Sequence, residues 1–207
     1  MNKWRLTIIL VVLAGLVGLA VWGWGNTLRG TSPVVTSSVV DPSVRIGGAF
    51  NLTDQNGKAQ TEKLLEGKWT AVFFGFTYCP DICPLTLQTL EQARTRLGNK
   101  GKDLQFVFIT VDPERDNPAA MKSYLNSSGF PEGVIGLTGT DAQIAEVAKA
   151  YRATYEKVGE GRDYTMNHTS VIYLMNPEGE FADPLAYGLT PQQMADVISK
   201  AKASYGK

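Results

Sequence analysis

The sequence predicts an α/β protein in which a central mixed sheet is flanked by helices. Two observations support this fold class. Short apolar runs, rich in β-branched and aromatic residues, alternate along the chain with segments whose apolar side chains recur at helical spacing. Clusters of Gly, Pro, Asp and Asn separate these runs, and one of them is short enough for a tight turn, which favours some antiparallel pairing in the sheet.

The first segment of the chain predicts a membrane anchor. From Leu6 to Trp24 there are 19 residues without a charge, Lys3 and Arg5 precede them, and tryptophans lie at both ends. About 20 apolar residues are needed to cross a bilayer, and the positive flank stays in the cytoplasm. The alternative is a signal peptide cleaved near residues 18–20, but the apolar run continues beyond that point. In both cases we expect the rest of the chain to be exported.

We therefore expect a transmembrane anchor at residues 1–25, an extended linker at 26–43 and a folded domain at 44–207. The expected location is a bacterial inner membrane, crossed once, with the N-terminus in the cytoplasm and the folded domain in the periplasm. The chain has 20 basic and 20 acidic residues and no basic cluster. We therefore expect no nucleic-acid partner.

The strands are predicted from apolar or alternating runs bounded by turn residues. The first two of these runs are expected to form a hairpin, and the last two are separated by the tight turn Asn176-Pro177-Glu178-Gly179. In chain order the expected strands cover residues 50–53, 58–60, 71–74, 104–111, 134–137, 171–175 and 179–182.

Four helices are predicted from apolar side chains at helical spacing, and three of them carry start signals. The first helix begins near Cys83, and the second opens at Asn117-Pro118 with proline at its favoured first position. Thr140 and Thr190 each stand three residues before a glutamine, which is the spacing of a capping box. The last two helices are therefore expected to begin there.

The only two cysteines, Cys79 and Cys83, lie where the strand at 71–74 gives way to a helix. Free N–H groups and the positive end of the helix dipole stabilise anions at a helix N-terminus, and they can lower a thiol pKa from its free value of about 8.5. Two cysteines are too few for a disulfide scaffold. The pair therefore predicts redox chemistry or metal binding.

The single histidine, His168, precedes the strand at 171–175, on a segment that we expect to be a loop. A lone histidine is more often a packed or surface residue than a ligand. However, two thiolates four residues apart are expected to lie on one helical face, which suits either a disulfide or a metal, and soft thiolates together with an imidazole suit copper. Zinc would require a fourth ligand, and the chain has no further Cys or His.

Four stretches together resemble the Sco/SenC family of membrane-tethered copper proteins. They are Phe74–Pro84, Thr110–Asp116, Gly136–Gly139 and Asn167–Thr169, and they occur in the family's order within a match from about Val44 to Ala201. The resemblance implies a thioredoxin-like fold. It also implies that the protein helps to assemble the CuA centre in subunit II of cytochrome c oxidase, and that an upstream periplasmic donor supplies copper.

Carried onto this chain, the resemblance implies that Cys79, Cys83 and His168 bind Cu(I), Cu(II) or both, with the two cysteines also forming a redox pair. It further implies that Asp112 supports metal uptake and redox behaviour near the site. The alternative for Asp112 is a turn residue at the end of a strand. Many relatives have Asp where Asn167 stands, so a carboxylate effect on the histidine is not expected here.

Two alternative functions are consistent with the same two cysteines. One is a metallochaperone that passes copper to a membrane-bound acceptor, helped by its tether. The other is a thiol–disulfide oxidoreductase that reduces a cuproprotein before metallation, for which His168 is dispensable. A peroxidase is the weakest alternative, because Thr77 stands two residues before Cys79 instead of the three that peroxiredoxins use.

Overall fold

A computed structural model describes Trp4 and residues 45–206. The predicted anchor and linker lie outside the described residues apart from Trp4, so the division of the chain into these parts stays a prediction. Among the described residues, no helix combines the length and the apolarity that a membrane span requires.

The main sheet has seven strands in the order β2-β1-β5-β4-β3-β8-β9. β3 pairs in parallel with β4, and β4 pairs in parallel with β5, whereas the other neighbours are antiparallel. The prediction of a central mixed sheet is therefore confirmed. The strands are β1 (Asn51–Asp54), β2 (Ala59–Thr61), β3 (Trp69–Gly75), β4 (Leu104–Thr110), β5 (Ile135–Thr138), β8 (Ile172–Met175) and β9 (Phe181–Leu185).

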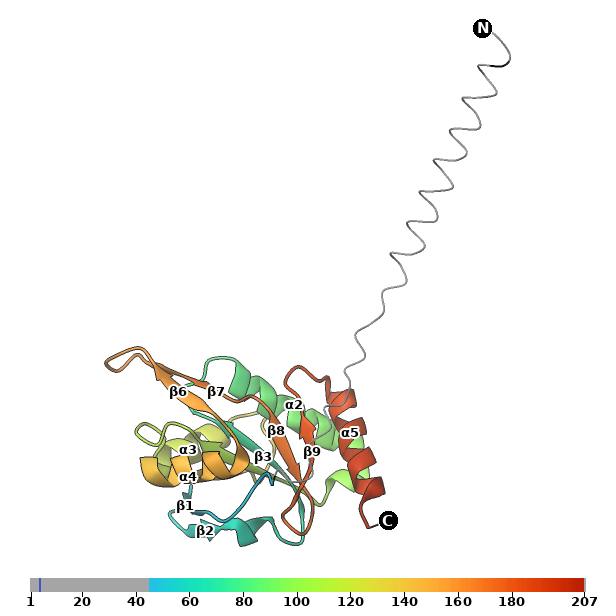
Figure 1. The fold of residues 1–207 in the computed structure, drawn as a ribbon, viewed down its shortest axis with the longest axis horizontal. Coiled ribbons are helices and arrows are strands. Elements are labelled where there is room, and N and C mark those ends of the chain that lie inside the picture. The colour runs from blue at the N-terminus through green and yellow to red at the C-terminus, as the bar shows by residue number, and fades with distance from the viewer. Residues whose placement is uncertain (1–3, 5–44, 207) are drawn as a thin grey trace. The chain divides into compact units, whose positions relative to one another are not determined.

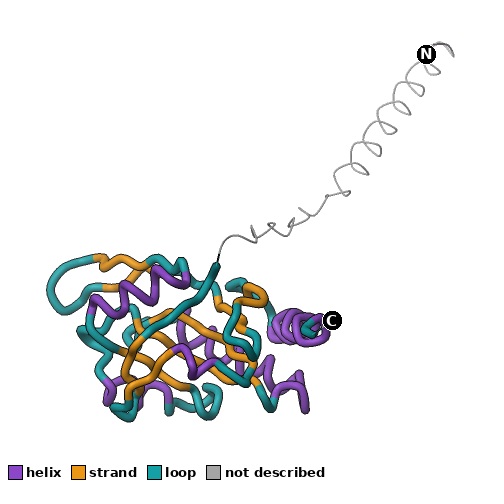
Figure 2. The backbone as a smooth tube through the Cα atoms, turned by 60° about the horizontal axis from the view of Figure 1, so that its bottom comes forward, coloured by secondary structure: helices purple, strands orange, loops and turns teal. Residues whose placement is uncertain are grey.

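Helices cover both faces of this sheet, with the strands between them (Figure 2). Phe108 on β4 contacts Tyr124 of α3, and Gly75 on the same face lies against Cys83 of α2. Phe74 points to the opposite face, where it contacts Tyr151 of α4. The α-helices are α2 (Ile82–Leu97), α3 (Pro118–Leu125), α4 (Asp141–Tyr151) and α5 (Pro191–Ser204), and two short 3-10 helices, η1 (Glu62–Leu65) and η2 (Gly98–Gly101), complete the set.

The predicted helix starts are confirmed. Asn117 caps α3, because its side chain accepts a hydrogen bond from the Ala120 N–H, and Pro118 is the first helical residue. Thr140 and Thr190 each form a complete capping box with the glutamine three residues later. These signals act within one helical turn, which is why the sequence reveals them.

One hairpin was not predicted. β6 (Tyr155–Val158) and β7 (Thr165–His168) pair with each other in a separate two-stranded sheet, which projects beyond the main sheet in Figure 1. The expectation that His168 lies on a loop is wrong, because it is the last residue of β7. The two strands are mostly exposed and polar, with Met166 the only buried residue, so they lack the apolar alternation by which a strand is recognised.

Candidate metal centre

Three segments bring the two cysteines and the histidine to one edge of the sheet. β3 and β4 are parallel and in register from Trp69 opposite Leu104 to Gly75 opposite Thr110, so both end at this edge. β8 is antiparallel to β3 and therefore begins there, just after His168. The cysteine loop follows β3, and the hairpin precedes β8. As a result, one donor atom from each of Cys79, Cys83 and His168 lies within 4.8 Å of the other two.

Cys83 lies in the first turn of α2 and is fully buried. Cys79 lies in the preceding loop and is half-buried, so the two thiols do not share a helical face as the sequence suggested. The Cys83 backbone N–H donates to the Cys79 sulfur at 3.4 Å. The helix N-terminus thus supports a thiolate at Cys79, as expected. Asp81 is the N-cap residue, but its side chain makes no capping hydrogen bond.

The two thiols have opposite pKa shifts because they share a proton. A hydrogen bond from the Cys83 side chain lowers the pKa of Cys79, with smaller contributions in the same direction from backbone N–H groups. The same hydrogen bond, together with burial, raises the pKa of Cys83. At neutral pH the pair is therefore a Cys79 thiolate beside a Cys83 thiol.

His168 presents Nε2 to the thiols. Its Nδ1 lies 3.0 Å from the Thr169 carbonyl oxygen, which can only accept a hydrogen bond, so Nδ1 carries the proton of the neutral ring. The lone pair on Nε2 is then free, and Nε2 lies 3.6 Å from the Cys83 sulfur. Phe73 and Phe76 contact the ring edge-on at centroid distances of 6.0 and 5.9 Å. The imidazole is thus oriented as a metal ligand would be.

The supporting residue proposed from the sequence, Asp112, lies outside the donor cluster. It follows β4, is buried, and its carboxylate accepts hydrogen bonds from Arg115 Nε at 2.5 Å and from the Tyr164 hydroxyl at 2.6 Å. Asp112 is therefore not part of the donor group, and its side-chain hydrogen bonds join it to Arg115 and Tyr164 instead.

A second buried carboxylate, Asp116, holds the cysteine loop, and the sequence reasoning missed this role. It accepts hydrogen bonds from the Thr77 N–H at 3.0 Å, from the Thr77 hydroxyl at 2.5 Å and from the Thr110 hydroxyl at 2.6 Å. The available signal was the run of charged residues from Asp112 to Asp116, because it ends a strand parallel to the cysteine strand and must lie at the same sheet edge.

A cleft of about 420 Å³ opens beside the donor atoms. One wall comes from the cysteine loop and the start of α2, and the other comes from β7. The lining residues are Phe76, Cys79–Ile82 and Thr165–His168. Solvent, a metal ion or a partner's side chain can therefore reach Cys79 and His168, whereas Cys83 is buried and does not line the cleft.

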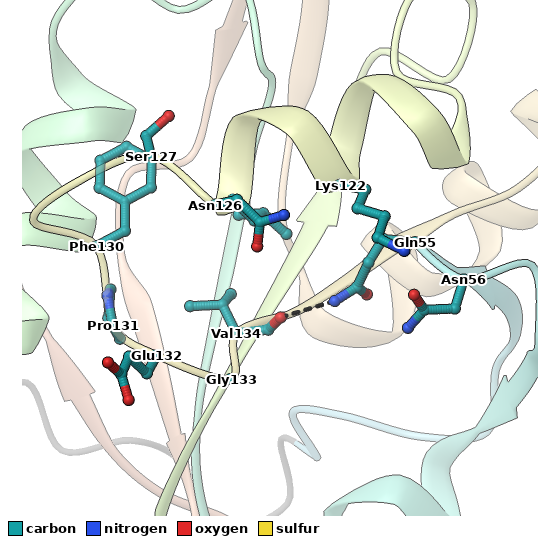
Figure 3. Close-up of a pocket in the computed structure, with 11 residues that line it drawn as sticks. Gln55, Asn56, Lys122, Asn126, Ser127, Phe130, Pro131, Glu132, Gly133 and Val134 are labelled. Atoms are coloured by element: carbon teal, nitrogen blue, oxygen red, sulfur yellow. Dashed lines mark hydrogen bonds between the residues drawn. The ribbon is translucent and has the colours of Figure 1, made fainter.

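Another pocket, of about 310 Å³, lies between the β1–β2 turn, the end of α3 and the segment before β5 (Figure 3). Gln55 lines it and donates to the Val134 carbonyl while accepting from the Gly136 N–H, both at 2.9 Å. Its lining contains no cysteine or histidine. The contacts of Gln55 give this region a structural role in joining β1 to β5.

The donor set at the sheet edge suits copper. Two sulfur ligands and one imidazole nitrogen match the preference of Cu(I) for soft ligands, and three donors fall short of the four that a structural zinc site uses. Among residues 45–206, these three form the only group of at least three Cys, His, Asp or Glu side chains with donor atoms close enough to hold a metal ion.

Comparisons with known proteins place the chain among copper proteins of one family. The SCO1/SenC family model matches residues 40–203. The chain is 38% identical over 208 residues to "Protein SCO2, mitochondrial" of Saccharomyces cerevisiae, covering 99% of this chain and 68% of the relative. It is 42% identical over 164 residues to "Protein SCO1, mitochondrial" of the same yeast, covering 77% of this chain and 55% of the relative.

Solved structures agree with the sequence match. The ScoI structure of Bradyrhizobium japonicum with copper bound has 46% identity and a TM-score of 0.67, with 75% of this chain and 99% of that chain covered. The ScoI structure of Arabidopsis thaliana with copper bound has 42% identity and a TM-score of 0.73, with 77% of this chain and 99% of that chain covered. These similarities confirm the expected thioredoxin-like fold.

Proposed function

Because the chain belongs to the SCO1/SenC family, we propose that it is a copper chaperone that binds copper through Cys79, Cys83 and His168. One observation carries this proposal: the donor atoms of the three side chains lie within 4.8 Å of one another at a cleft open to solvent. Two relatives of known structure carry copper.

The chain's own groups suit capture of the ion. Cys79 is already a thiolate and is reachable from the cleft, so it is the first contact. His168 offers a free Nε2 lone pair beside it. Cys83 holds a proton, which must leave when its sulfur binds the metal. Copper bound here would be cargo, held by three ligands, and a partner with more ligands could remove it by exchange from the exposed side.

We propose that the acceptor is the CuA domain of cytochrome c oxidase subunit II and that a periplasmic protein donates the copper. A family member with a structure 27% identical to this chain is described as one of the "cytochrome c oxidase assembly proteins". An N-terminal anchor in a bacterial inner membrane would keep the domain near this acceptor and raise its effective concentration. Extraction of membranes at alkaline pH tests the anchor, because an inserted protein stays with the membrane fraction and a peripheral one is released.

The test of the copper site is an anaerobic titration of the reduced full chain with Cu(I), and with Cu(II) followed by its visible spectrum. We expect one copper per chain and a thiolate charge-transfer band for Cu(II). His168→Ala should weaken binding and alter the band, whereas Asn167→Ala should change neither, because Asn167 is exposed and adjacent but outside the donor cluster. Binding that is indifferent to His168 would refute the proposed ligand set.

The geometry also favours a second function, thiol–disulfide exchange. A reachable thiolate at Cys79 and a buried thiol at Cys83 are the arrangement of an attacking and a resolving cysteine. The Cys79 thiolate would attack a disulfide of the partner, releasing one partner thiolate and forming a mixed disulfide. Cys83 would then lose its proton and attack the Cys79 sulfur, so that the partner gains two electrons and this chain acquires a disulfide. His168→Ala distinguishes the functions, because only the chaperone requires the imidazole.

A further inference from the structure

The segments that carry Cys79 and His168 are attached to the body of the domain independently. The cysteine loop is held by Asp116 through Thr77. The β6–β7 hairpin belongs to a separate sheet, so no strand of the main sheet pairs with it. The distance between the thiolate and the imidazole is therefore not set by the sheet hydrogen bonds, and another contact must fix it.

Arg115 contacts both segments. On the hairpin side, its Nη1 donates to the Tyr164 carbonyl oxygen at 2.9 Å, and its guanidinium carbon lies 3.6 Å from the centre of the Tyr164 ring. On the loop side, the same carbon lies 4.6 Å from the centre of the ring of Tyr78, which is the residue before Cys79. The guanidinium therefore joins an aromatic ring on one segment to an aromatic ring on the other.

Asp112 fixes the position of this guanidinium. Its carboxylate is 3% exposed and binds Arg115 Nε, while the arginine side chain is 14% exposed. Tyr164 closes the cluster, because its hydroxyl donates to the other carboxylate oxygen of Asp112. A buried pair of this kind has a defined geometry, unlike the ion pair between Lys157 on the hairpin and Glu114 on the segment after β4, whose side chains are 45% and 68% exposed.

We propose that Arg115 is a positioning residue that holds the Cys79 loop and the His168 hairpin at the spacing a metal ion requires. Only a planar guanidinium can bind a carboxylate, donate to a carbonyl and contact two rings with its faces at the same time. The inference concerns the arrangement of the metal-free protein, and its consequence for copper rests on the proposed function. It also gives Asp112 a physical role, which is to orient Arg115.

The first test uses the metal-free full chain and compares Arg115→Lys with Glu114→Gln. The lysine keeps the positive charge beside Asp112 but loses the planar guanidinium and its stacking on the two rings. The glutamine removes the charge of the exposed ion pair with Lys157 but keeps a side-chain oxygen that can accept from the Tyr164 hydroxyl. We expect Arg115→Lys to speed amide hydrogen exchange about tenfold in peptides from residues 77–83 and 155–168 and to leave α5 unchanged. The Glu114→Gln chain should exchange like the wild type. Unchanged exchange, or an equal increase in α5, would overturn the proposal.

The second test measures Cu(I) affinity by competition in four chains: wild type, Arg115→Lys, His168→Ala and the double variant. If Arg115 acts by positioning the imidazole, Arg115→Lys lowers affinity roughly tenfold in the wild-type background and has little effect when His168 is absent. An equal loss in both backgrounds would refute positioning of His168. If His168→Ala binds Cu(I) as tightly as the wild type, the proposed function fails, while the exchange experiment still decides the role of Arg115.

Discussion

Asp116 offers the sharpest quantitative prediction, because its carboxylate is fully buried and accepts three hydrogen bonds from Thr77 and Thr110. Asp116→Ala leaves those three donors without their partner. Hydrogen bonds to a charged group contribute about 1.5–3 kcal/mol each, but burial of the carboxylate opposes them and raises its pKa. We therefore take about 1 kcal/mol per bond and expect a loss of about 3 kcal/mol.

The assay is urea unfolding followed by tryptophan fluorescence and circular dichroism. For a domain of this size, a loss of about 3 kcal/mol corresponds to a fall in Tm of roughly 6–12 °C. Asp81→Ala is the matched control, because Asp81 is exposed in the same loop and its side chain makes no capping hydrogen bond. A loss below about 1 kcal/mol for Asp116→Ala would refute the reasoning, since it would mean that the three bonds merely balance the burial cost.

The stability difference between the wild type and Asp116→Ala should also depend on pH. Because burial raises the pKa of Asp116 in the folded state, protonation of this carboxyl favours folding. The additional stability that comes from this protonation is fully present below the unfolded pKa of about 3.9, and it is lost as the pH rises through the higher folded pKa. The difference in unfolding free energy between wild type and Asp116→Ala should therefore widen as the pH falls from 7. A difference that narrows on acidification would contradict the raised pKa.

Three further predictions concern the site and its neighbours. Gly75→Ala places a Cβ 2.7 Å from the Phe108 ring and 2.9 Å from the Cys83 sulfur, so we expect a loss of about 1–3 kcal/mol by urea unfolding, together with weaker copper binding. In the reduced metal-free chain, the rate at which iodoacetamide alkylates Cys79 should change little between pH 6 and 8, whereas the alkylation rate of a thiol with an unshifted pKa would rise about a hundredfold. Cys83 should stay unmodified until the chain unfolds, because it is buried and keeps its proton. Tyr164→Phe removes one of two side-chain hydrogen bonds to Asp112 and should lower the unfolding free energy by about 1 kcal/mol.

For each of these three variants or measurements, a different outcome would contradict the physical reason given. Wild-type stability in Gly75→Ala would mean that Phe108 and Cys83 move aside freely. Gly48→Ala serves as the control, because its φ is not positive and its added Cβ meets only Ala150, at an ordinary 3.5 Å. A Cys79 alkylation rate that rises steeply towards pH 8 would contradict its lowered pKa. An unchanged unfolding free energy in Tyr164→Phe would mean that the hydrogen bond from Tyr164 to Asp112 adds no stability, and that Arg115 alone stabilises this carboxylate.

The elements that the sequence predicted well depend on local interactions. The capping boxes at Thr140 and Thr190 join residues three apart, so the pattern itself contains both partners. The buried strands β3 and β4 are continuous apolar runs because helices cover both faces of the sheet, and such runs are visible without a structure. Strand ends differed from the predicted ones by a few residues at most, with β3 beginning at Trp69 instead of residue 71.

The β6–β7 hairpin shows where local reasoning fails. The hairpin is held by Arg115 and Asp112, which bind Tyr164 from a segment about 50 residues earlier in the chain. Because the hairpin buries almost no apolar side chain, its sequence carries no periodic signal for strand structure. Its position can be recognised only when the long-range contacts are known.

The sequence by itself determined the chemistry of this protein: two thiols at a strand-to-helix junction, one imidazole, and a helix N-terminus that favours thiolate, all of which follow from residue type and local pattern. Only the tertiary structure decided that His168, 85 residues from Cys83, lies 3.6 Å from its sulfur. It also decided which thiol solvent can reach, which thiol keeps the proton, and that Arg115 contacts both segments. The physical reason is that a donor atom's identity belongs to its residue, whereas its distance from other donors is set by strand pairing and by contacts between segments remote in the chain.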